Sequence, residues 1–131
     1  MSKEEFEKLV LQAFARLSPE VKKKISNVVF IVEDDARGKS GKEQIIKYEG
    51  MLLGLFEGIP RSMRGENYFN VLPDKITIFQ HPIENICGGD YQKIKELVYE
   101  VVWHEVGHHF GFSEKGIREL EKKRFGNKLG H

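Results

Sequence analysis

The sequence predicts one α+β domain, in which N-terminal helices and a long C-terminal helix flank a small β-sheet of about three or four strands. Three observations predict this fold class. Apolar residues recur at helical spacing near both ends of the chain, β-branched residues gather in short runs between them, and no strand–helix–strand unit repeats. With 131 residues, 40% of them hydrophobic and 31% charged, the chain fits one globular domain over residues 1–131.

The N-terminal segment is predicted to form two helices. Apolar side chains spaced three and four apart over residues 6–17 are typical of an amphipathic helix, and Ser2 with Glu5 can form a capping box at its start. Ser18 stands directly before Pro19, a cap followed by proline at the first helical position. A second, short helix is therefore expected there.

Three middle segments are predicted to be strands. NVVFIVED (27–34) is rich in β-branched residues, MLLGLFEG (51–58) is a short apolar run bounded by glycine, and DKITIFQHP (74–82) alternates and ends at its proline. ARGKSGK (36–42) has the composition of an exposed flexible loop. The segment at 59–73 has too many helix and strand breakers for a regular element.

A long helix follows, which Asp90 can cap and Gly111 can close. Ser113 can cap a last, short helix carrying Ile117 and Leu120. The residues of the long helix at spacings of three and four, which are expected to face inward, are Ile94, Leu97, Val98, Val101, His104, Glu105 and His108.

The inward stripe of the long helix contains a metal-binding pattern. His104 and His108 are one turn apart, so their side chains share a face with Cβ atoms about 5–6 Å apart, and two such imidazoles can ligate one Zn²⁺ at about 2.0–2.1 Å. Glu105 is rotated by about 100° from His104 and can flank the metal without ligating it. This His-Glu-x-x-His arrangement predicts a catalytic zinc site with Glu105 as general base.

A catalytic zinc ion normally has three protein ligands. Glu114 comes three residues after Gly111, the spacing at which an extended form of the motif returns its third ligand, and a helix first turn favours the ionised carboxylate. His81 is the alternative candidate for the third metal ligand. His109 is expected to hold a ligating side chain in place or to pack against it. The alternative interpretation is a helix with two hydrogen-bonded histidines and an ordinary first-turn glutamate.

Composition excludes several other classes of function. A formal net charge of +1 gives no reason to expect a nucleic-acid or membrane partner. Cys87 is the only cysteine, so no internal disulfide can form, and the charged N-terminus lacks the apolar core of a secretory signal. We therefore expect a cytoplasmic protein. The GKS tripeptide does not make a phosphate loop, because Glu33 stands where the Walker spacing needs glycine.

The chain resembles the small zincin-like metallopeptidases of bacteria, sometimes described as minimal metalloproteases. The resemblance covers roughly Val28 to Glu121, through NVVFIVED, LLGLFEGIPRSMR, LPDKITIFQHPI and HEVGHHFGFSE. It implies a compact zincin-like fold and one zinc ion at His104 and His108, with Glu105 as base and Glu114 at the third-ligand position. The family commonly has tyrosine at position 56 and often aspartate at position 114, where this chain has phenylalanine and glutamate.

Two functions follow from these residues. The first is hydrolysis of a peptide or protein substrate, which could lie extended along the edge of NVVFIVED or of KITIFQ (75–80). The side chains that could serve as a second donor to the developing oxyanion are Tyr48, Tyr68, Tyr91, His81 and His109. The alternative is a non-catalytic zincin scaffold that binds metal or a peptide. The same chemistry would also permit hydrolysis of a non-peptide amide or ester.

Overall fold

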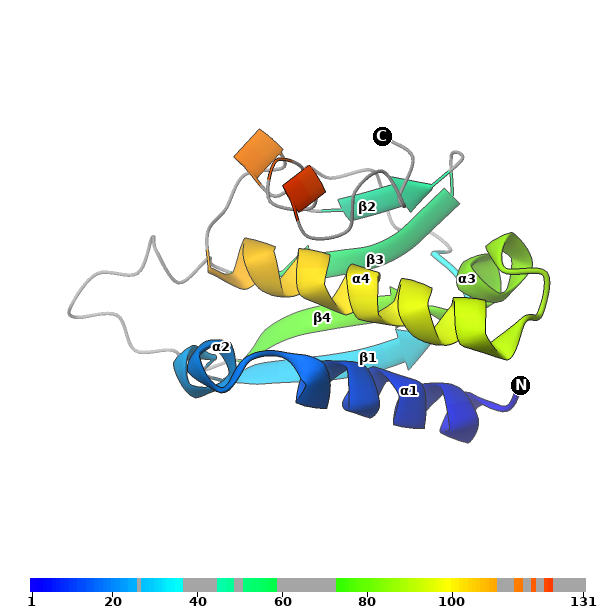
Figure 1. The fold of residues 1–131 in the computed structure, drawn as a ribbon, viewed down its shortest axis with the longest axis horizontal. Helices are drawn as coiled ribbons and strands as arrows, with labels where there is room; N and C mark the ends of the chain where they lie inside the picture. Colours follow the sequence, from blue (N-terminus) through cyan, green and yellow to red (C-terminus); the bar gives the residue numbers. More distant parts are fainter. Residues whose placement is uncertain are drawn as a thin grey trace.

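The computed structural model is an α+β fold in which α1 and α4 lie side by side across one face of a β-sheet (Figure 1). The residues that the structure describes are 1–25, 27–36, 45–48, 51–58, 73–110, 115–116, 119 and 122–123. The predicted fold class is confirmed.

The two N-terminal helices are α1 (Lys3–Arg16) and α2 (Pro19–Lys24). Both predicted caps are confirmed. Ser2 and Glu5 form a complete capping box, with a backbone-to-side-chain hydrogen bond in each direction at 3.0 and 3.1 Å. The Ser18 hydroxyl accepts from the backbone N–H three residues further on, at 3.2 Å.

Within the described residues, four strands form one sheet in the order β1-β4-β3-β2. They are β1 (Val28–Glu33), β2 (Ile45–Tyr48), β3 (Met51–Glu57) and β4 (Asp74–Phe79). β4 pairs in parallel with β1 and antiparallel with β3, and β2 pairs antiparallel with β3. The three predicted strands are confirmed, whereas β2 was not predicted.

The prediction that the strand at 74–82 runs on to its proline is wrong, because β4 ends at Phe79 and α3 (Gln80–Ile86) begins at once. Pro82 lies in the first turn of α3, where a missing N–H breaks no helical hydrogen bond. A turn at 87–89 follows α3. It contains Gly88 and Gly89 at φ +59° and +75°, a backbone conformation that favours glycine.

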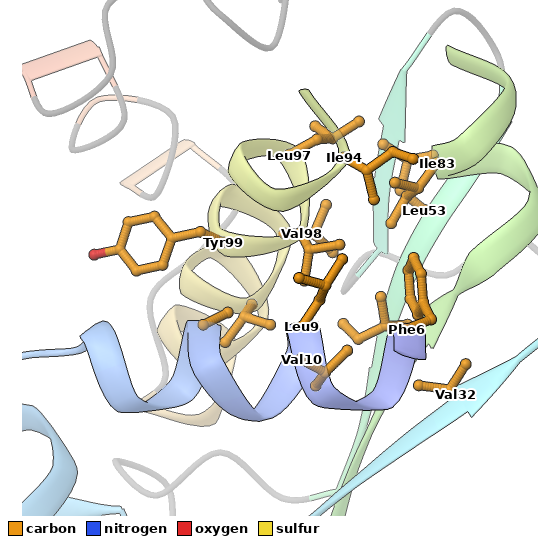
Figure 2. Packing of buried hydrophobic residues seen from close by; sticks show 14 of the residues in the cluster. Phe6, Leu9, Val10, Val32, Leu53, Ile83, Ile94, Leu97, Val98 and Tyr99 are labelled. Atoms are coloured by element: carbon orange, nitrogen blue, oxygen red, sulfur yellow. The ribbon is translucent and has the colours of Figure 1, made fainter. Parts of the chain in front are cut away.

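A bulge in β3 directs two consecutive residues towards the helices. Ile46 pairs with Gly54 but the next residue of β2 pairs with Leu52, so Leu53 is the extra residue. Leu53 is fully buried beside Ile83 in the core beneath the helices (Figure 2), and a Cβ at Gly54 would meet Val101 of α4 at 2.8 Å. Regular alternation would have sent one of these two residues to the other face.

The main core lies between the sheet and the pair α1 and α4 (Figure 2). Phe6, Leu9 and Val10 of α1 pack there with Val98 of α4. Leu55 and Phe79 form a smaller cluster that does not belong to this core.

The long helix is α4 (Tyr91–His109), and the Asp90 carboxylate caps it by accepting from Lys93 N at 3.1 Å. All seven residues of the predicted inward stripe are buried. Burial extends beyond that stripe, because five further residues of α4 are also buried: Tyr99, Glu100, Val102, Val106 and His109. From Leu97 to His109, α4 is thus almost wholly buried against the sheet and α1, whereas its first six residues are mostly exposed.

The predicted closing Gly111 and most of the predicted last helix lie outside the described residues, although residues 115–116, 119 and 122–123 have helical backbone. No helix in the described ranges combines the length and the apolar character needed to span a bilayer.

Candidate metal centre

The C-terminal end of α4 concentrates four buried ionisable side chains within six residues. His104, Glu105, His108 and His109 are 1%, 0%, 3% and 0% exposed. At 3.6 residues per turn they form two adjacent pairs, each with a spacing of four. His104 and His108 share one face, and Glu105 and His109 share the next. Burying so many polar groups is costly unless hydrogen bonds, charges or a metal compensate.

The first pair has the separation expected of two imidazoles on one ion. The ring centroids of His104 and His108 are 5.2 Å apart and the rings are inclined at 63°. An ion held at about 2.0–2.1 Å by one ring nitrogen lies about 3.2 Å from the centroid of that ring. When two rings bind the same ion at a tetrahedral angle, their centroids are therefore about 5.2 Å apart. The separation of these two rings therefore fits two imidazoles that share one zinc ion.

Glu105 lies against the backbone of β3. A Cβ on Gly54 would lie 3.3 Å from both Cγ and Oε2 of Glu105. The carboxylate therefore occupies space that only glycine leaves open at this position of the strand. Gly54 owes its orientation to the bulge, so the bulge and the glycine together make room for the predicted base.

His109 is attached to the sheet through a residue that sequence analysis did not single out. Its Nδ1 is 2.7 Å from Oδ2 of Asp74, the first residue of β4, and both side chains are buried. The ring also meets Phe56 of β3 edge-on, with centroids 6.2 Å apart. Asp74 is the only acidic residue of the strand DKITIF, but nothing in the sequence indicates its partner 35 positions away.

Asp74 is itself closely held. Its backbone N–H donates to the carbonyl of Asn27 at 2.9 Å, and it pairs with Val28 of β1. Gly58 lies directly beside its side chain at φ +153°, and a Cβ there would overlap Oδ1 of Asp74. Glycine at this position therefore permits the carboxylate to sit where it does.

The other candidates divide into those placed away from the site and those not described. His81 is 55% exposed near Asp34, beyond the end of β4 opposite to Asp74, so it is not close to His104 and His108. Tyr91 begins α4, about 20 Å along the helix from Glu105. The side chain of Tyr48, and Tyr68 and Glu114, fall outside the described residues.

The third ligand is therefore not part of the described geometry. Across the ranges that the structure describes, no group of three or more His, Cys, Asp or Glu side chains forms a metal-binding cluster. The structure places the rings of His104 and His108 side by side, with Glu105 buried on the neighbouring face of the same helix. The metal-binding and catalytic roles of these residues, and of Glu114, stay predictions.

Comparison with known protein families agrees with this geometry. The model of the zincin-like metallopeptidase family matches residues 25–124, which include α4 and all four strands. The comparison with curated proteins finds no match. The match confirms the resemblance noted from the sequence, and it covers well over half of the chain. This protein belongs to the zincin-like metallopeptidase family.

Proposed function

We propose that the protein is a zinc-dependent peptidase in which His104 and His108 ligate one Zn²⁺ and Glu105 is the general base. The observation that carries the proposal is the juxtaposition of two imidazoles at 5.2 Å with a fully buried carboxylate one residue along the same helix. Glu114 is proposed as the third ligand on its spacing after Gly111 alone.

Bound zinc would supply a Lewis acid for the substrate carbonyl and make water acidic enough to lose a proton near neutral pH. Glu105, on the face next to the histidines, accepts that proton as water attacks and returns it to the leaving amine. Its burial keeps bulk water from competing for the proton.

A substrate peptide is proposed to lie along β2. The expectation that KITIFQ offers an edge is wrong, because β4 is paired on both sides. The edges of the described sheet are β1 and β2. Each edge strand contacts a helix, β1 with α1 and β2 with α4. β2 is preferred because it adjoins β3, the strand whose Gly54 touches Glu105. Backbone hydrogen bonds to β2 would hold an extended peptide on the side of the base.

A metal-binding module without turnover is the second candidate. The near-complete burial of both histidines favours it, because a buried ion leaves little room for a substrate. Such a module would bind a peptide or stabilise the fold without cleaving a bond.

The experiment combines elemental analysis of the purified protein with a broad peptide-library cleavage assay. We expect about one zinc per chain and cleavage that Glu105→Gln abolishes while zinc is retained. His108→Ala should lose the metal. Glu96→Gln makes the same chemical change at an exposed position of the same helix and should remain active. Zinc binding without cleavage would favour the module, and equal activity of Glu105→Gln would contradict the assignment of the base.

A further inference from the structure

The hydrogen bond between Asp74 and His109 connects β4 to the last residue of α4. It lies outside the group of residues to which the proposed chemistry gives a role. At 0% and 2% exposure, His109 and Asp74 are shielded from water. An ionised carboxylate can only accept, so Nδ1 of His109 donates the proton. Hydrogen bonds to a charged acceptor are among the stronger ones, and low exposure strengthens them further.

This hydrogen bond lies next to the face of α4 that carries His104 and His108. His109 follows His108 directly, so the two Cα atoms differ by a rotation of about 100° and a rise of about 1.5 Å. Fixing the side chain of one therefore fixes the direction of the other. Without a tertiary contact this turn would be free to fray, because α4 ends at His109 and Phe110 is its cap.

The sheet end of the contact is rigid. Asp74 opens β4, which is paired on both sides, and its backbone N–H is bonded to Asn27 at 2.9 Å. One turn earlier on the same face of α4, Glu105 rests on Gly54. The Glu105–His109 face is thus held at two points, on β3 and on β4. The hydrogen bond at the His109 end is directional, so it is this contact that sets the rotation of the last turn about the helix axis.

We propose that Asp74 is a positioning residue for the zinc ligands. Through His109 it holds the last turn of α4 at the rotation and height at which the rings of His104 and His108 can share one ion. This inference rests on the proposed zinc site. It adds a residue of β4 that would determine how tightly the ion is held.

The test measures zinc affinity of the full-length, metal-free protein by competition with a chromophoric chelator, alongside the visible spectrum of the Co²⁺-loaded protein and unfolding in urea. Asp74→Ala removes the acceptor, and His109→Phe removes the donor but keeps a ring against Phe56. Asp74→Asn keeps a carbonyl that can accept from Nδ1. Ile78→Val is the matched control, since it trims a buried side chain on the same strand without a polar contact.

We expect Asp74→Ala and His109→Phe each to weaken zinc binding about tenfold or more and to alter the Co²⁺ absorption bands. Asp74→Asn should stay within about threefold of wild type, as a neutral acceptor still holds the ring. The double variant Asp74→Ala/His109→Phe should bind about as weakly as the weaker single variant, since both remove one contact. Ile78→Val should lower the free energy of unfolding without changing zinc affinity.

Unchanged zinc affinity and an unchanged Co²⁺ spectrum in Asp74→Ala and His109→Phe, with lower stability, would overturn the positioning role and leave the peptidase proposal standing. If Asp74→Ala does not fold, His109→Phe decides by the same criterion. Absence of zinc binding by the wild-type protein would instead overturn the proposed function, and the positioning role with it.

Discussion

Gly54 of β3 and Glu105 of α4 are in contact at a point where no side chain fits between them. A Cβ on Gly54 would lie 3.3 Å from Oε2 of Glu105 and 2.8 Å from Cγ1 of Val101. The base proposed for peptide hydrolysis is thus placed by a strand residue about 50 positions earlier in the chain.

Gly54→Ala should therefore displace Glu105 while leaving His104 and His108 in place. Overpacking of this kind costs about 1–3 kcal/mol of folding free energy. We expect kcat for peptide cleavage to fall by at least about tenfold, since a general base contributes about 10²–10⁴-fold, with zinc affinity kept. Leu55→Val changes the next residue of β3, which packs in the smaller cluster, and should keep its kcat. Full activity in Gly54→Ala would show that Glu105 tolerates the shift or is not the base.

Phe6 of α1 is 0% exposed in the main core, although α1 precedes the segment that the family model matches. Phe6→Ala should lower the free energy of unfolding by about 3–5 kcal/mol, the usual cost of removing a buried aromatic ring. Urea unfolding measures this loss. Leu11→Ala, at a 65% exposed position of the same helix, is the control and should change stability little. Equal effects of the two would mean that α1 does not pack on α4 in solution.

The capping box predicts a pH dependence at the start of α1. The backbone N–H of Ser2, and then its hydroxyl, lower the pKa of Glu5 below its ordinary value of 4.5. A carboxyl with a depressed pKa stabilises the fold above its unfolded pKa, and this contribution is lost as pH falls through the folded pKa. The stability difference between wild type and Glu5→Gln should therefore shrink between about pH 6 and about pH 3. A constant difference across this range would contradict the hydrogen bond.

Cys87 follows α3 and is buried. Burial is the main cause that raises the pKa of its thiol above the ordinary value of 9.0, with the Asp90 carboxylate adding to it. Because the thiolate is the reactive form, the native protein should react with a disulfide reagent much more slowly than the urea-unfolded chain. Similar rates in the two states would place Cys87 in solvent.

Local signals in the sequence were sufficient for α1, α2 and α4 and for the burial of His104, Glu105 and His108 on the inner side of α4. The caps at Ser2, Ser18 and Asp90 were predicted because each acts within three residues, and His104, Glu105 and His108 were predicted because helix geometry alone relates them. The apolar stripe underestimated the burial of α4, since a stripe records one packed face and not the additional cover from α1.

Features that depend on contacts between distant segments were not predicted. β2 consists of only four residues, IIKY, which are too few to show an alternating pattern. Its pairing with the bulged strand β3 is a contact between two segments. The pattern of residues 74–82 predicts one strand that ends at Pro82, whereas Pro82 lies in the first turn of α3. The roles of Gly54 and Asp74 became visible only when the sheet was placed against α4.

The parallel pairing of β1 with β4 has a consequence for how this protein reaches its native state. Val28 lies opposite Asp74, 46 positions later (74 − 28 = 46), so the chain must close a long loop before β4 is in place. Contacts of such high sequence separation slow folding, whereas helices form locally within microseconds. In refolding after rapid dilution from urea, the far-ultraviolet circular dichroism signal should therefore recover before the protein can bind zinc. The recovery of zinc binding would report when β4 has paired with β1.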